Sequence, residues 1–391
     1  MPNSRCYQSV SSINLLALIS VLGLLSAFPL VARAEGRLRR TLQITNILDS
    51  EVLNYPCALL RGKAGDRADT VRIQNPGNTR IGSVTVVPVI DGRFVAVVEL
   101  SPGMNHLDIR CGNEQMEFTL IYQRVQSGHY VNVIYLTAAD SGTHYLTQLT
   151  DDPQDYADKL GTALKLMQTL TAERMNDIGF GRSTFALDLD NKGKVIIHTL
   201  KFPDTAAHLQ TQDGGTLYHR IYPLITQRFP QNQVQNVVIM AFSSYDPVTK
   251  KPHAHCALGA PGMGLFSCNG MCAWPSSISD VQRSFSDTTP VDNTKLWDDS
   301  NSRSVFWGLA ATTMGAVLHE MGHSFGLPHV ADPESIMSRG FDHFNRVFTI
   351  TEPAALGGAI PTRFVLTQSA YWDKESAKKL VVSPWFHRVK N

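Results

Sequence analysis

The most informative stretch of the chain is HEMGHSFGLPH, residues 319–329. His319 and His323 are four residues apart, so on a helix their imidazoles lie on one face and can bind a single metal ion. Gly326 permits the left-handed backbone that ends a helix and turns the chain back. That turn would bring His329 to the same ion as a third nitrogen ligand.

Three neutral imidazoles leave one position of a tetrahedral zinc ion open, which is typical of catalytic rather than structural zinc. Glu320 lies beside that open position, where its carboxylate can take a proton from water. An ordinary helix with buried histidines is the alternative for a bare His-Glu-x-x-His pattern. Because Gly326 and His329 follow at the matching spacing, we expect a Zn²⁺ site. Its expected ligands are His319, His323 and His329, with Glu320 as the catalytic residue.

The N-terminus has the features of a secretory signal peptide. Arg5 precedes an apolar run from Leu15 to Val31, and the small-residue exit Ala32-Arg33-Ala34 follows. This order predicts cleavage after Ala34, and a retained membrane anchor is the alternative. We therefore expect residues 1–34 to be a signal peptide and the mature protein to be secreted, into the periplasm if the host is a bacterium.

Charge and composition narrow the range of partners. The 391 residues are 43% hydrophobic and 18% charged, as in an ordinary globular protein, and their net charge is +1. Because no polybasic block is present, nucleic acid and anionic membranes are not expected as partners. No stretch beyond the signal peptide is apolar enough to predict stable membrane insertion. The run Arg37-Leu38-Arg39-Arg40 is either a processing site or an exposed linker.

Five cysteines would remain after signal removal, and in an exported protein they are candidates for disulfide bonds. Cys57 and Cys111 lie far from the others in the sequence and are expected to pair. The other three are Cys256, Cys268 and Cys272. Two nearby histidines could join these three in a second zinc site, but the spacing matches no closed site. A disulfide within the trio is therefore favoured, with its pairing open.

The rest of the sequence divides into two regions of different periodicity. In the first, residues 41–140, short Val- and Ile-rich runs alternate with turn sequences such as Asn75-Pro76-Gly77. Such evenly spaced strands without a helical stretch predict an antiparallel, Ig-like β-sandwich. The expected strands include Val71–Ile73, Val84–Val87, Phe94–Leu100, Leu107–Ile109, Phe118–Tyr122 and Val131–Leu136.

In the second region, residues 145–391, helical and strand patterns alternate. Apolar residues recur at helical spacing from Tyr156 to Leu170, a second helix is expected from about Thr216 to Phe229, and a third from about Arg303 into the zinc motif. Strands are expected at 185–189, 195–197 and 237–242. Alternation of this kind predicts an α/β layer domain. The chain is thus expected to be α+β, with the β-sandwich followed by an α/β zinc protease domain.

The 319–329 stretch resembles the motif of the metzincin zinc proteases, His-Glu-x-x-His-x-x-Gly-x-x-His. Ser335-Ile336-Met337 follows at a spacing similar to that of the methionine turn beneath the metal in that group. Astacin-type metzincins have a tyrosine two residues after this methionine. This chain has Arg339 there, so no tyrosine-assisted oxyanion is expected at that position. The resemblance implies that substrate peptides bind along an exposed sheet edge, near Gly262 to Phe266.

A narrower resemblance is to a zinc metallopeptidase family known mainly from fungi. It rests on motifs spread over most of the mature chain: Gly92–Phe94, Leu100–Asn105, Trp274–Pro275, Arg339–Arg346 and Ser383–Phe386. Members resemble a β-sandwich followed by a metzincin-like domain. Some add a jacalin-like lectin module, which we do not expect here because the sequence ends soon after Phe386.

These patterns predict a secreted zinc endopeptidase that hydrolyses protein or peptide substrates with water activated by Glu320. A secreted zinc-binding adhesin or carbohydrate-binding protein with a non-catalytic peptidase-like domain is one alternative. An exported protein in which the histidines only stabilise the fold is another. The carboxylate of Glu320 argues against the first, and three rather than four ligands argue against the second. Asp342 and His343 either orient the ligand imidazoles or form a polar turn.

Overall fold

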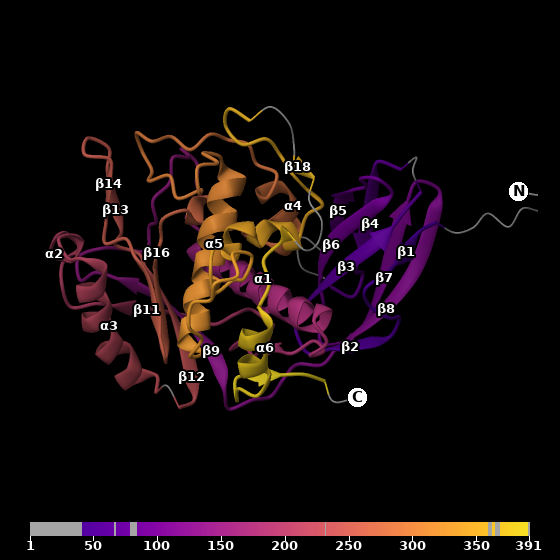
Figure 1. The fold of residues 1–391 in the computed structure, drawn as a ribbon, viewed down its shortest axis with the longest axis horizontal. Coiled ribbons are helices and arrows are strands. Elements are labelled where there is room, and N and C mark those ends of the chain that lie inside the picture. Colours follow the sequence, from indigo (N-terminus) through magenta and orange to yellow (C-terminus); the bar gives the residue numbers. More distant parts are fainter. Residues whose placement is uncertain are drawn as a thin grey trace, which may run out of the picture. The chain divides into compact units, whose positions relative to one another are not determined.

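The computed structural model describes residues 41–65, 68–78, 84–230, 232–358, 362–363 and 368–389. The expected signal peptide at 1–34 and the basic run at 37–40 lie outside these residues. Within the described ranges, no helix combines the length and the apolar character that crossing a membrane requires. The described chain is a mixed α/β structure with several sheets (Figure 1).

Strands β1 to β8 form two sheets that share one apolar core. A three-stranded sheet has the order β1-β3-β6 and a five-stranded sheet the order β2-β8-β7-β4-β5. The described pairings are antiparallel except that of β2 with β8, which is parallel. The bounds are β1 Gln43–Ile44, β2 Glu51–Leu53, β3 Cys57–Lys63, β4 Thr70–Gln74, β5 Val84–Pro88, β6 Arg93–Glu99, β7 Gly103–Cys111 and β8 Glu114–Tyr122.

Alternating side chains explain why these runs form strands around a common core. Val71 and Ile73 of β4 and Leu107 and Ile109 of β7 are fully buried, while the residues between them are at least partly exposed. This period of two is what the sequence pattern predicts for a sheet with one buried face. The strands expected between residues 71 and 122 are all formed.

The run Val131–Leu136, which the sequence pattern groups with these strands, belongs to a different sheet. It forms β9, Tyr130–Thr137, which lies between β11 and β12 and runs parallel to both. Nearly every residue of β9 is buried, because both faces of the strand are covered. The prediction that placed this run in the sandwich is therefore wrong. A strand buried on both faces cannot be assigned to a sheet from its own apolar pattern.

The second sheet system has the order β11-β9-β12-β16-β15 and is parallel except for its edge strand β15. Its other strands are β11 Ile197–Lys201, β12 Val234–Met240, β15 Ala257–Ala260 and β16 Met263–Ser267. The main helices are α1 Tyr156–Asp177, α3 Gly214–Arg228 and α5 Phe306–Ser324, close to the predicted spans. Val237 and Ile239 of β12 pack into the core that contains α1 and α5, whereas Val238 and Met240 pack into the core with α3. Helices therefore cover both faces of this sheet (Figure 1).

Smaller elements complete the chain. They are β10 Thr184–Phe185, α2 Ala206–Gln210, β13 Ser244–Asp246, β14 Lys251–His253, η1 Met271–Ala273, η2 Ile278–Asp280, α4 Val281–Ser284, η3 Gly340–Val347, β17 Thr351–Glu352, β18 Thr362–Arg363, α6 Lys374–Val381 and β19 Phe386–His387. The turn at 190–193 joins the two runs expected as strands at 185–189 and 195–197, which meet at a single antiparallel bridge, Leu189 with Val195. The strand after that turn starts at Ile197 and continues parallel to β9.

Helix α1 connects the N-terminal sheets to the rest of the chain through buried charges. Lys165 of α1 forms an ion pair with Glu99 of β6 at 2.6 Å. Glu173, which is fully buried, accepts hydrogen bonds from the Tyr55 hydroxyl at 2.7 Å and from Arg182 Nε at 2.8 Å. Because buried charges are stable only when they are paired, these contacts fix α1 against the N-terminal sheets.

The expected Cys57–Cys111 disulfide is not formed, since Cys111 is a free thiol. Side chains alternate along β3, so Cys57 points into the core shared with α1, whereas its neighbour Ala58 points into the core that contains Cys111. Among the described residues, the trio expected to contain a disulfide consists of thiols too. Burial raises the pKa of the Cys268 thiol to about 11 and that of Cys272 to about 12.

Candidate metal centre

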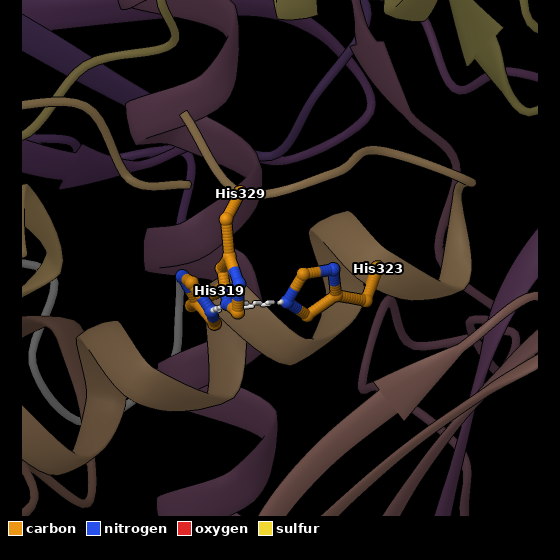
Figure 2. A group of neighbouring side chains, drawn as sticks. All are labelled: His319, His323 and His329. Carbon is orange, nitrogen blue, oxygen red and sulfur yellow. Dashed lines mark hydrogen bonds between the residues drawn. The ribbon is translucent and has the colours of Figure 1, made fainter. Parts of the chain in front are cut away.

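Helix α5 carries the first half of the motif and ends at Ser324, two residues before the predicted glycine. Gly326 has φ +84°, in the left-handed region. Its N–H donates to the carbonyl of His323 at 2.9 Å, and the N–H of Leu327 donates to the carbonyl of Gly322 at 3.0 Å. These bonds form the Schellman arrangement, which closes a helix and reverses the chain. The reversal places His329 opposite the helix face that holds His319 and His323 (Figure 2).

The structure brings the three predicted ligands together. The Nε2 atoms of His319, His323 and His329 lie 3.1 Å from one another in each of the three pairs (Figure 2). Nitrogen ligands about 2.0–2.1 Å from a tetrahedral zinc ion lie roughly 3.3 Å apart, so the observed triangle has the size that zinc requires. The site is layered in depth, with His319 buried, His323 half-buried and His329 exposed.

Backbone carbonyls fix the tautomers of two of these rings. His319 Nδ1 lies 2.6 Å from the carbonyl oxygen of Ile336, and His323 Nδ1 lies 2.8 Å from that of Leu327. A carbonyl can only accept, so both Nδ1 atoms carry the proton and both Nε2 atoms present a lone pair. Lone pairs that face each other at 3.1 Å repel unless a cation lies among them, and this donor set therefore fits a metal ion.

Burial favours the neutral form of the two helix imidazoles, His319 and His323. The pKa of His319 is lowered to about 4, mainly by burial, and the neighbouring charges of His323, His329 and Arg339 lower it further. Burial also lowers the pKa of His323. Because zinc binds the unprotonated nitrogen, these shifts favour metal binding at neutral pH.

Glu320 lies where α5 packs tightly against β15 and β16. Gly259 of β15 and Gly264 of β16 are direct partners in the sheet, and both face the backbone of Glu320. A Cβ atom on Gly259 would lie 2.4 Å from the Glu320 carbonyl oxygen and 2.9 Å from its Oε2 atom. This pair of glycines is what lets the helix approach so closely. Burial raises the pKa of the Glu320 carboxyl to about 8.

The Ser335–Met337 segment packs against α5 at Gly322. Met337 is fully buried, and a Cβ atom on Gly322 would lie 2.2 Å from its sulfur, so the helix backbone contacts the thioether directly. The carbonyl of Met337 accepts a hydrogen bond from the N–H of Val330 at 3.1 Å. The same short segment therefore positions both the helix and the loop that carries His329.

A cavity of about 360 Å³ opens beside the three histidines. Glu320 lines it together with His319 and His329, and so do two residues from beyond Met337, Arg339 and Phe341. The Phe341 ring lies 5.2 Å from the His319 ring, and the Arg339 guanidinium lies 4.7 Å from the centre of the Phe341 ring. Phe341 lies in the Arg339–Arg346 motif that carries the family resemblance, although no role at the site was predicted for it. Arg339 stood out by its position two residues after Met337.

Asp342 and His343, the two polar residues after Phe341, make no contact with the ligand imidazoles among the described contacts. Asp342 forms an ion pair with Arg339 at 2.7 Å and accepts a hydrogen bond from Asn301. His343 Nδ1 lies 2.8 Å from a carboxylate oxygen of Glu334. Of the two interpretations from the sequence, the polar turn therefore fits Asp342 and His343. The imidazoles of His319 and His323 are oriented by the backbone carbonyls of Ile336 and Leu327.

The exposed sheet edge differs from the one expected. Residues near Gly262 to Phe266 were expected to form it, but β16 lies inside the sheet between β12 and β15. The edge strand is β15, and its first residue, Ala257, lines the cavity beside Glu320. With its alanines and glycine, the β15 sequence Ala-Leu-Gly-Ala has little of the β-branched character that marks a strand.

Comparison with known proteins shows a family match over almost all of the described chain. A family model with the description "Putative peptidase family" matches residues 41–391. A Schizosaccharomyces pombe protein named "Putative zinc metalloproteinase" is 25% identical in an alignment 334 positions long that covers 79% of this chain and 54% of that protein. A protein of the same description from Saccharomyces cerevisiae is 23% identical and is matched over 89% of this chain and 55% of its own length. The chain spans about half the length of these relatives.

Solved structures are less similar. Wild-type OgpA from Akkermansia muciniphila has a TM-score of 0.42 and 16% identity, and the match covers 68% of this chain and 63% of OgpA. Archaemetzincin from Methanopyrus kandleri has a TM-score of 0.28 and 11% identity, with coverage of 66% and 96%. Likenesses of this size add nothing to the geometry described above.

Proposed function

This chain belongs to the peptidase family whose model it matches, and from that premise we propose that it is a secreted zinc endopeptidase. Zinc is its cofactor, the metal for which both curated relatives are named. We propose His319, His323 and His329 as its ligands. One observation carries the proposal: the Nε2 atoms of the three histidines converge at 3.1 Å, beside a cavity that Glu320 lines together with His319 and His329.

When bound, zinc would supply a Lewis acid that polarises the scissile carbonyl and makes water a stronger acid. The charge of a bound zinc ion would oppose the effect of burial on the Glu320 pKa and favour the ionised carboxylate. Glu320 would then accept a proton from water at a carboxylate oxygen and return it to the nitrogen of the leaving amine. The carbonyls of Ile336 and Leu327 would keep the two helix imidazoles in the Nδ1-protonated tautomer and raise their basicity as ligands. Met337 would pack against α5 and so fix the position of Glu320 relative to the cavity.

Peptide substrates would bind along β15. An edge strand presents unpaired N–H and C=O groups, and an extended peptide can satisfy them by adding as a further strand. Ala257 at the start of β15 borders the cavity, so a peptide on this edge would pass beside Glu320. Because a chain bound along a strand can continue in both directions, this mode favours an endopeptidase.

Two further parts of the proposal concern architecture and location. Residues 41–140, apart from β9, would form an Ig-like β-sandwich, supported by the two sheets around one core. Residues 145–391 would form a metzincin-like domain, supported by the zinc motif and the contact of Met337 with α5. Secretion rests on the sequence of residues 1–34, and N-terminal sequencing of exported protein should then find Glu35 first.

The central test combines metal analysis with a digest of a general fluorogenic peptide library. Glu320→Gln should retain one zinc ion per chain and lose at least about a hundredfold in kcat/KM, because general acid–base catalysis contributes that much. His329→Ala should lose zinc. Glu375→Gln is the matched control, since Glu375 is exposed and pairs only with Lys378 in the described contacts.

The outcomes separate the functional classes. Equal cleavage by the wild type and by Glu320→Gln would remove Glu320 from its proposed role. Zinc bound tightly by the wild type without any cleavage across the library would favour the non-catalytic zinc-binding protein instead.

A further inference from the structure

The cavity beside the three histidines has one exposed cation on its wall. Arg339 lines this cavity, and its side chain is 61% exposed. Its guanidinium lies over the Phe341 ring, and the other neighbour of that ring is the imidazole of His319. The guanidinium is therefore separated from a proposed zinc ligand by a single aromatic ring.

Two contacts hold the guanidinium in place. The Phe341 ring supports its flat face at 4.7 Å. On one edge, an Nη atom pairs with Asp342 at 2.7 Å, and the Asp342 side chain is itself only 3% exposed. Asp342 is fixed in turn by the side-chain amide of Asn301. An arginine restrained in this way loses less conformational freedom when it binds a ligand than a free surface arginine does.

The rest of the guanidinium remains available. The ion pair with Asp342 uses one of its edges, and the high exposure of the side chain leaves the remaining N–H donors facing solvent and the cavity. Asp342 is buried and does not line the cavity. On the cavity wall formed by Arg339 and Phe341, the accessible charge is therefore the positive charge of Arg339. Ser338 lines the same cavity and adds a hydroxyl donor. Several donors in a planar fork match the two oxygens of a carboxylate.

We propose that Arg339 is a specificity-determining residue that binds a carboxylate of the peptide substrate close to the scissile bond. This inference rests on the proposed function of the site. The carboxylate could belong to an acidic side chain or to a free C-terminus. Both sources offer the same chemistry to Arg339, and the experiment below distinguishes them.

The test uses four fluorogenic peptides built on one sequence that the library digest identifies. They carry Asp or Asn next to the cleaved bond, each with a free or an amidated C-terminus. Full-length, zinc-loaded wild type should prefer the carboxylate-bearing peptide by about tenfold to a hundredfold in kcat/KM, the range expected for charge-assisted hydrogen bonds. A preference that follows Asp over Asn assigns the carboxylate to a side chain. One that follows the free acid over the amide assigns it to the C-terminus.

Substitutions then connect the preference to Arg339. In Arg339→Met the ratio of kcat/KM values should fall to about one, and in Arg339→Glu it should invert. Arg339→Lys should keep part of the ratio, since it keeps the charge and loses the fork. Arg283→Met is the matched control, because Arg283 forms the same kind of i,i+3 pair with an aspartate but is 75% exposed and lies outside the cavity.

A binding measurement keeps this test separate from that of the proposed function. Fluorescence anisotropy of the same peptides with zinc-loaded Glu320→Gln reports recognition without turnover. If the library digest yields no cleaved sequence, the proposed function fails, and the four peptides are then built on an arbitrary extended sequence. A Kd ratio for those peptides that depends on Arg339 still supports carboxylate binding. Equal affinity for the Asp and Asn peptides and for the acid and amide forms would overturn it. A preference that survives Arg339→Met would overturn it too.

Discussion

Replacing Gly259 with alanine tests how closely the edge strand must approach the helix of the metal centre. The added Cβ atom would lie 2.4 Å from the carbonyl oxygen of Glu320 and 2.7 Å from the Cβ atom of His323. Both neighbours belong to α5, and one of them is backbone, so no side-chain rotation can relieve the contact. The strand and the helix must separate by several tenths of an ångström.

The expected cost follows from the two opposing effects of this substitution. Overpacking at a tight backbone contact costs about 1–3 kcal/mol. Replacing glycine with alanine returns roughly 0.4–1 kcal/mol by restricting the unfolded chain. The net loss is then about 1 kcal/mol, which in a chain of this length lowers the melting temperature by at most roughly 2–4 °C. Because the displaced segment carries Glu320 and His323, zinc affinity should fall by about tenfold to a hundredfold, measured by competition with a chromophoric chelator.

Two other glycines provide a graded control. Gly264→Ala places its Cβ atom 3.0 Å from the nearest atom of Glu320, which a small adjustment can relieve, so it should cost less than Gly259→Ala. Gly128→Ala meets nothing within 4 Å and should be neutral or slightly stabilising, with unchanged zinc affinity. Equal stability and equal zinc affinity for all three variants would refute the close approach.

Two further predictions concern buried charges. Glu173→Ala should destabilise the protein by about 3–5 kcal/mol in urea denaturation, because Arg182 loses a buried partner, whereas Tyr55→Phe should cost only about 1 kcal/mol. A loss below 1 kcal/mol in Glu173→Ala would contradict that account. Burial alone would raise the pKa of Glu352, but the hydrogen bond and charge of Arg346 hold it below its usual value. Its contribution to stability is therefore complete above the ordinary glutamate pKa of about 4.3 and is lost as pH falls through the lower folded value. Unfolding free energies measured against pH should show a shallower acid limb in Glu352→Gln, and an unchanged slope would count against the pairing.

The candidate site was predictable because its geometry is local. An i,i+4 pair on a helix, a glycine that ends the helix and a histidine three residues later lie within 11 residues, 319–329. Backbone rules alone bring such residues together, whatever the rest of the chain does. For the same reason, the alternating strands between residues 71 and 122 and the spans of α1, α3 and α5 followed from periodicity.

What the sequence could not provide depends on contacts between distant segments. The apolar run of β9 does not indicate which strands flank it. The sequence around Cys57 does not indicate on which face of β3 its side chain lies. The sequence of the edge strand β15 suggests a loop because it contains a glycine, Gly259. That glycine is needed for the close contact with Glu320 of α5, about sixty residues further along the chain. The cavity wall formed by Arg339 and Phe341 likewise depends on how a turn after Met337 folds back over His319.

Packing along α1 joins the N-terminal sheets to the metal centre. One cluster of buried side chains contains Leu59 of β3, Val97 of β6, much of α1 and the apolar face of α5. On the other side of α1, Lys165 and Glu173 are paired with residues that the N-terminal strands supply. Removing those strands would expose this core and leave Lys165 without Glu99, at a cost of several kcal/mol. Glu173 would lose the Tyr55 hydroxyl and keep Arg182. The N-terminal sheets are therefore a structural part of the unit that holds the three histidines, and they are unsuited to act as a detachable module.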